Sequence, residues 1–101
     1  MNPGNLPIPR HEIAEFCRQH RVVEFGFFGS ILRDDFRPDS DVDVLITFAP
    51  DAQPSLMDLV LMQDELGRLF GRDVDLVEKP GLRNPFRRRE ILRTVEMVYA
   101  S

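Results

Sequence analysis

Hydrophobic residues recur along the chain with two periods, one typical of helices and one typical of strands. Intervals of three and four predict amphipathic helices at 10–20, 56–70 and 85–99. Alternation, or a run of β-branched and aromatic residues, predicts strands at 22–28, 41–48 and 72–79. This order, without a repeat or a linker, predicts one α/β domain over residues 1–101, a small mixed sheet with helices packed on it. Residues 1–9, with three prolines, are expected to form an irregular lead-in.

Small and polar residues mark the ends of the predicted helices. Ser55 can cap the middle helix, with Asp58 three positions later as its acidic partner. Gly71 is placed to end that helix, because glycine adopts the left-handed conformation that closes a helix at little cost. Asn84 followed by Pro85 predicts the start of the last helix.

Composition and charge narrow the functional classes. The chain is 43% hydrophobic and 30% charged, as in ordinary globular proteins, and its net charge of −4 argues against direct nucleic-acid binding through a broadly basic surface. Cys17 is the only cysteine, so no internal disulfide can form, and we expect it to be buried on the first helix. No apolar run approaches 18 residues, which predicts a cytoplasmic protein without a membrane span.

Two aspartates stand unexpectedly close together on an apolar strand. Side chains alternate along a strand, so Asp41 and Asp43 are expected on one face, where their like charges repel unless a cation lies between them. Mg²⁺ prefers such oxygen ligands together with substrate phosphates. Asp75, on the next strand, is the natural third carboxylate, as a metal ligand or as a proton acceptor. Asp73 shares its expected face and is the alternative, but apolar neighbours flank Asp75 on both sides, which favours Asp75.

The turn after the first strand has the residues of a phosphate-binding site. Gly29 allows a ligand to approach the backbone closely, and Ser30 adds a hydroxyl donor. Arg33 is spaced to pair with a terminal phosphate. A Gly-Ser pair or an Asp-x-Asp pair is common by itself, whereas their combination with a later apolar-Asp-apolar strand is specific. Together these residues predict a metal-dependent site for a nucleoside triphosphate.

The spacing Gly29-Ser30, ten residues, Asp41-x-Asp43 resembles the signature of the DNA polymerase β-like nucleotidyltransferase superfamily. The whole chain is similar to its minimal nucleotidyltransferases, known as MNT proteins. The resemblance implies a polymerase β-like α/β fold with helices on one side of the sheet, and Mg²⁺-dependent nucleotidyl transfer from ATP. It also implies that Asp41 and Asp43 are the metal-binding pair, Asp75 the third carboxylate, and Gly29 and Ser30 the phosphate-holding turn.

The chain departs from many relatives beside this turn. Where they read Gly-Ser-x-Ala-Arg-Gly, Leu32 and Asp34 replace the alanine and the second glycine, while Arg33 keeps the arginine. Asp34 and Asp35 add negative charge close to where a triphosphate would lie. We therefore expect weaker nucleotide binding or a changed metal requirement, with the three carboxylates intact.

The resemblance also implies a biological role. MNT proteins are commonly antitoxins of HEPN-domain ribonuclease toxins, so the resemblance implies transfer of AMP to a tyrosine of such a partner. The small size of the chain leaves little room for a small-molecule acceptor pocket, which favours a protein acceptor. The alternatives are an antitoxin that neutralises its partner by binding alone, and an aminoglycoside-type nucleotidyltransferase subunit.

Three further features each allow two interpretations. The last predicted helix has a basic side, which is either a solvated surface or a contact for phosphate or an acidic partner. Met57 and Met62 of the middle helix belong either to the core or to a partner-binding patch. Tyr99 is expected to be packed, and self-modification there is the less favoured interpretation. The arginines of the basic side are Arg83, Arg87, Arg88, Arg89 and Arg93.

Overall fold

The structure is a computed structural model that describes residues 8–29, 41–79 and 83–101. The elements in chain order are α1 (Arg10–His20), β1 (Val22–Phe28), β2 (Val42–Phe48), α2 (Leu56–Phe70), β3 (Val74–Glu78), α3 (Pro85–Thr94) and β4 (Glu96–Ala100). The predictions for Ser30, Arg33, Asp34 and Asp35 lie outside the described residues. No helix within the described ranges is long and apolar enough to cross a membrane.

The predicted caps of α2 and α3 are confirmed. Ser55 and Asp58 form a complete capping box, in which the Ser55 hydroxyl accepts from the Asp58 amide and the Asp58 carboxylate accepts from the Ser55 amide. Gly71 ends α2 in the left-handed conformation, with φ of 68°. The Asn84 side chain accepts from the amides of Phe86 and Arg87, and Pro85 opens α3.

The four strands form one mixed sheet in the order β3-β2-β1-β4. β1 is antiparallel to both β2 and β4, whereas β2 and β3 are parallel. Since α2 connects these two parallel strands, it returns the chain so that both strands start at the same end of the sheet.

The prediction that the last helix extends to Tyr99 was wrong. α3 ends at Thr94, whose hydroxyl donates to the Glu90 carbonyl, and Val95 is already extended. The spacing of Ile91, Val95 and Val98 fits a helix as well as it fits a helix followed by a strand. Pairing with the open edge of β1 decides the outcome, because β4 there gains backbone hydrogen bonds that a helix would not make with the sheet.

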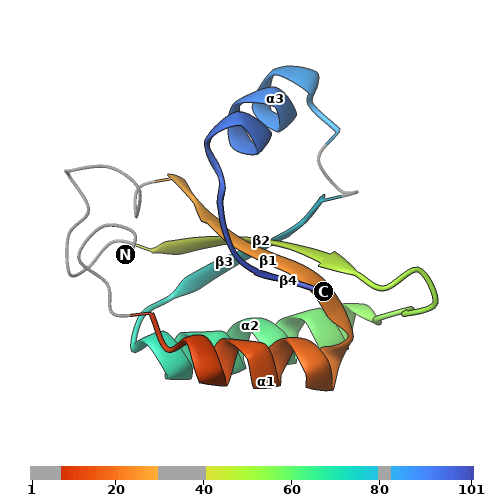
Figure 1. Ribbon diagram of the computed structural model, residues 1–101, viewed down its shortest axis with the longest axis vertical. Coiled ribbons are helices and arrows are strands. Elements are labelled where there is room, and N and C mark those ends of the chain that lie inside the picture. Colours follow the sequence, from red (N-terminus) through yellow and green to blue (C-terminus); the bar gives the residue numbers. More distant parts are fainter. Residues whose placement is uncertain (1–7, 30–40, 80–82) are drawn as a thin grey trace.

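The sheet is covered on both faces, and not on one side as the family resemblance implied. α1 and α2 lie together under one face, and α3 lies over the other (Figure 1). The face that α1 and α2 cover is called here the closed face. It contains the main core, which includes Phe25, Phe27, Val44 and Ile46. The α3 side, called the open face, has a small buried cluster of Phe28, Leu45 and Ile91.

The structure shows how far Tyr99 and two methionines of α2 are buried. Tyr99 packs half-buried against the main core from β4, as the sequence predicted. Met62 is fully buried, whereas Met57 points outward and is exposed. Core packing therefore explains Met62, whereas it does not explain Met57.

Candidate active site

The parallel register of β2 and β3 brings two predicted carboxylates side by side. Asp43 is the direct partner of Asp75 in this register. Neighbouring strands lie about 4.8 Å apart, so both side chains leave the sheet close together on one face. Val42, Val44 and Val74 point to the closed face, so alternation places this pair on the open face. We call Asp43 and Asp75 the carboxylate row.

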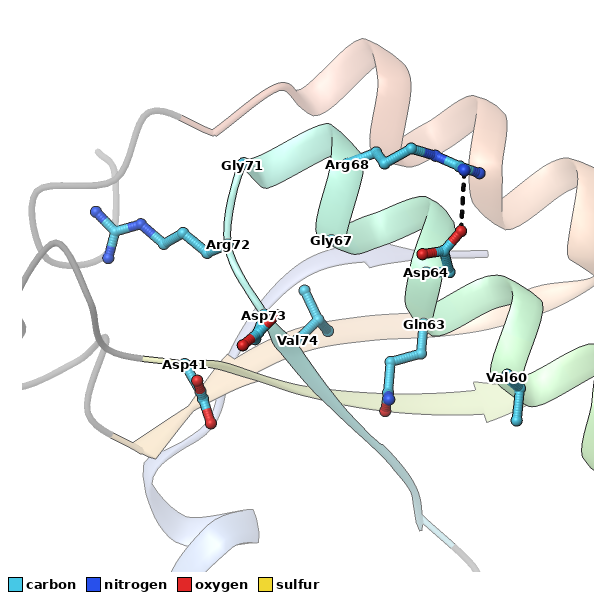
Figure 2. A pocket seen from close by; sticks show the side chains of 10 residues that line it. All are labelled: Asp41, Val60, Gln63, Asp64, Gly67, Arg68, Gly71, Arg72, Asp73 and Val74. Atoms are coloured by element: carbon cyan, nitrogen blue, oxygen red, sulfur yellow. Dashed lines mark ion pairs between the residues drawn. The ribbon is translucent and has the colours of Figure 1, made fainter.

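One step before this row, Asp41 and Asp73 come close to each other as well. The Val42 amide donates to the Asp73 carbonyl over 2.9 Å, which fixes the two chain segments together. Asp41 and Asp73 line one cavity of about 800 Å³, which lies between the start of β3 and the C-terminal half of α2 (Figure 2). The carboxylate row does not line this cavity. The cavity therefore borders the row at the strand ends without containing it.

Gly29 lies directly against the Asp43 carboxylate. Its φ is 77°, a conformation that residues with a side chain rarely adopt. A Cβ atom at this position would overlap the Asp43 carboxylate oxygen and lie only 3.1 Å from its carboxyl carbon. The register also pairs Phe28 with Asp43, so the end of β1 is held at the carboxylate row. Glycine is thus required here by the backbone and by the acid that packs on it.

The structure brings together the described part of the predicted site. Gly29, Asp43 and Asp75 meet on neighbouring strands, with Asp41 two residues before Asp43 on the same strand segment. The sequence argument for choosing Asp75 over Asp73 does not hold, because both are exposed. Register supports the choice instead, since Asp75 is the direct neighbour of Asp43. The phosphate contacts predicted for Ser30 and Arg33 fall outside the described residues.

The carboxylate row has the donor chemistry that a magnesium ion needs, although it is not a complete metal site. Within the described ranges, no three histidine, cysteine or acidic side chains converge closely enough to hold a metal ion by themselves. Mg²⁺ commonly binds through one or two carboxylates, with substrate phosphates and water as its other ligands. Two adjacent carboxylates beside the turn that the sequence predicted to bind phosphate fit that pattern of shared coordination.

Arg72 is a site neighbour that sequence reasoning missed. It lines the same cavity as Asp41 and Asp73 and brings a positive charge to that end of the sheet (Figure 2). In the sequence it stands between Gly71 and Asp73, where an arginine is an ordinary turn residue. Only the fold reveals that this turn faces the start of β2.

Cys17 takes no part in the chemistry. It is fully buried in the main core, as predicted. Burial raises the pKa of its thiol to about 12, so the reactive thiolate is scarcely populated near neutral pH. Cys17 is therefore a core residue of α1.

Comparison with known protein families shows which proteins the chain is similar to. The family model described as a nucleotidyltransferase domain matches residues 10–96. The protein adenylyltransferase MntA of Thermococcus cleftensis is 40% identical over 85 residues, which cover 84% of this chain and 81% of that protein. The match to the family model therefore extends from α1 to the start of β4.

Solved structures agree with the fold. A structure described as a minimal nucleotidyltransferase is 33% identical, with a TM-score of 0.70 and coverage of 86% of each chain. A second chain, at 18% identity, comes from the structure of a tri-AMPylated Shewanella oneidensis HEPN toxin in complex with an MNT antitoxin. It has a TM-score of 0.63 and covers 91% of this chain and 70% of that one. The predicted α/β class is confirmed, with a four-stranded mixed sheet and three helices.

Proposed function

The chain belongs to the nucleotidyltransferase domain family, and we propose that it is a protein adenylyltransferase that acts as the antitoxin of a HEPN ribonuclease. It would transfer AMP from ATP to a tyrosine hydroxyl of that partner. The observation that carries this proposal is the adjacency of Asp43 and Asp75 beside the Gly29 turn. The names of the relatives, a protein adenylyltransferase and an antitoxin bound to its AMPylated toxin, support the choice of acceptor.

The proposed reaction is a substitution at the α-phosphorus of ATP. The acceptor hydroxyl oxygen forms a bond to that phosphorus, the bond to the bridging oxygen of the β-phosphate breaks, and pyrophosphate leaves with the bonding electrons. The hydroxyl proton passes to the Asp75 carboxylate, which is exposed and faces the same side as Asp43. Gly29 keeps the backbone close enough for phosphate oxygens to reach its turn.

Magnesium fits this scheme through the carboxylate row. Asp43 and Asp75, with Asp41 at the start of β2, would hold the ion together with phosphate oxygens of ATP. When bound, Mg²⁺ neutralises the negative charge that develops on the leaving pyrophosphate. Without a cation the two neighbouring carboxylates repel both each other and the triphosphate, so binding of Mg²⁺ and ATP should be mutually dependent. Mg²⁺ and ATP are both abundant in the cytoplasm, where we place the reaction.

The proposal is tested by following AMP onto the partner. The purified chain is incubated with ATP, Mg²⁺ and the ribonuclease encoded beside it, and the intact mass of the partner is measured together with its RNA cleavage. We expect one or more AMP units on the partner and a matching loss of cleavage. The Asp41→Asn, Asp43→Asn double variant is the control, and it should transfer none. If this variant still silences the ribonuclease fully, neutralisation is by binding and the adenylylation mechanism is wrong.

A further inference from the structure

The outward side of α2 has an apolar surface that the core does not use. Met62 and Leu66 on the inner side are buried, as in any amphipathic helix. Four large apolar residues on the outer side are more than half exposed, and we call them the α2 stripe: Leu56 at 79%, Met57 at 63%, Val60 at 53% and Leu61 at 57%. Single exposed apolar side chains are common on proteins, whereas a contiguous group on one helix is typical of a binding surface.

The α2 stripe is continuous with the catalytic end of the sheet. Val60 belongs to the stripe and also lines the cavity that reaches Asp41 and Asp73 (Figure 2). Between them, the Gln63 side chain accepts a hydrogen bond from the Leu76 amide over 3.1 Å and so covers part of the outer edge of β3. A protein seated on the stripe would therefore extend along this cavity toward the carboxylate row.

The surroundings of the stripe have more acidic than basic side chains. Residues 50–67 contain no lysine or arginine but four acids, namely Asp51, Asp58, Asp64 and Glu65. Arg21 and Arg68 pair with Asp51 and Asp64 and offset their charges, and His20 bonds to Glu65, so Asp58 and Glu65 are the acids in excess over these arginines. Hydrogen bonds from Ser55 lower the pKa of Asp58, so it stays ionised at neutral pH. An apolar centre with an acidic rim is complementary to an apolar patch with a basic rim.

We propose that the α2 stripe is the docking surface for the acceptor ribonuclease and receives the basic surface with which that enzyme binds RNA. A protein that binds RNA needs such a basic surface to hold the phosphate backbone. Docking on the stripe covers that surface and brings the acceptor hydroxyl to the carboxylate row along the cavity. The identity of the partner rests on the proposed function. A second copy of this chain is the weaker occupant, because its stripe would be surrounded by the same excess of negative charge.

The test measures binding separately from chemistry. Met57→Ser with Leu61→Ser removes the centre of the stripe at positions where the side chains are exposed, so the fold should persist. Phe86→Ser is the matched control, since Phe86 is 83% exposed on α3 over the other face. We expect the double variant to raise the Kd for the intact ribonuclease more than about tenfold, and the control to leave it within about twofold. AMP transfer by the double variant should lose kcat/KM through KM, and saturating partner should restore kcat.

Each other outcome has a defined meaning. Unchanged affinity of the double variant, or no complex with the ribonuclease at all, overturns the docking surface. A dimer of the wild-type chain that the double variant dissolves, with partner affinity unchanged, assigns the stripe to self-association instead. A complex that depends on the stripe but transfers no AMP leaves the docking surface standing and contradicts the proposed function. Sedimentation velocity of the chain alone and of the mixture distinguishes these results.

Discussion

The two faces of the sheet differ in how completely they are buried, and the predicted site lies on the less covered one. On the closed face, strand residues such as Phe25 and Ile46 are fully buried under α1 and α2 in the main core. On the open face, the described residues form a smaller buried cluster of Phe28, Leu45 and Ile91, with Val77, Leu92 and Val95 packed partly buried against it, and polar groups lie beside this cluster. These include the carboxylate row, the Glu24–Lys79 ion pair at 3.4 Å, and the Thr47 hydroxyl.

The contrast shows how a small domain supports an unfavourable site. Adjacent like charges and uncovered strand residues reduce stability where they lie. The closed face offsets this by burying aromatic rings against one another: the Phe25 ring contacts the rings of Phe16 and Phe27 edge to face, at centroid distances of 6.1 and 5.6 Å. We therefore expect substitutions on the closed face to change stability and those on the open face to change activity.

Phe25→Ala should give the largest effect, a loss of stability from the core on the closed face. Removing a fully buried ring at the centre of the main core should cost about 3–5 kcal/mol in the free energy of unfolding, because a cavity remains. Urea unfolding followed by circular dichroism measures this loss. A cost below about 1 kcal/mol would show that the closed face does not carry the stability of the domain.

Asp43→Asn, on the open face, should lower activity without lowering stability. The rate of AMP transfer should fall at least about a hundredfold, because one carboxylate that positions the metal and the triphosphate is lost. The free energy of unfolding should stay the same or rise, since repulsion from Asp75 is removed. Single-turnover transfer and urea unfolding of one preparation supply both values. A variant that loses stability and keeps activity would reverse the assignment of the two faces.

Thr47→Val tests whether a buried polar group on the open face reduces stability. The Thr47 hydroxyl is buried and has no hydrogen-bond partner among the described residues. Valine has nearly the same shape without the unsatisfied polar group, so stability should rise by about 1 kcal/mol. Thermal unfolding measures the change. A clear loss of stability would indicate that the hydroxyl has a bonding role after all.

The Cys17 thiol on the closed face should make the stability of the fold depend on pH, with an effect about as small as that of Thr47→Val. Its folded-state pKa of about 12 lies above the ordinary value of 9.0, so burial of the neutral thiol stabilises the fold fully below pH 9. This contribution is lost as the pH rises toward 12, because the unfolded chain releases the proton first. Between pH 8 and 10 the wild type should lose about 1 kcal/mol more than Cys17→Ala. Equal slopes would mean that the thiol is accessible to solvent.

The sequence predicted α1, α2 and the first three strands because their apolar periodicity reflects burial on the closed face. Isoleucine, phenylalanine and cysteine at positions 13, 16 and 17 are buried as their spacing required. The end of the chain was different, since the pattern after Ile91 fits two structures. Gly26 was the unused signal: a Cβ there would lie 2.8 Å from a Val95 methyl carbon and 3.0 Å from the Glu96 carbonyl oxygen. Glycine inside a strand often marks such a close approach by another chain segment.

The candidate site was predictable in its residues and not in its arrangement. Alternation placed Asp43 and Asp75 on faces of their own strands, but only the parallel register makes them neighbours. Register depends on how α2 returns the chain to the sheet, which periodicity does not encode. The same holds for Asp41 and Asp73, which meet through a backbone hydrogen bond between segments about thirty residues apart in sequence.

The most direct test of the central claim compares Asp75→Asn with Asp73→Asn in the complete reaction. Both residues are exposed and lie two positions apart, Asp73 just before β3 and Asp75 within it, so the pair controls for charge and for location. At saturating ATP, Mg²⁺ and ribonuclease, we predict that Asp75→Asn lowers kcat for AMP transfer at least about a hundredfold and Asp73→Asn less than about fivefold. Equal losses, or a larger loss for Asp73→Asn, would contradict the assignment of catalysis to the carboxylate row.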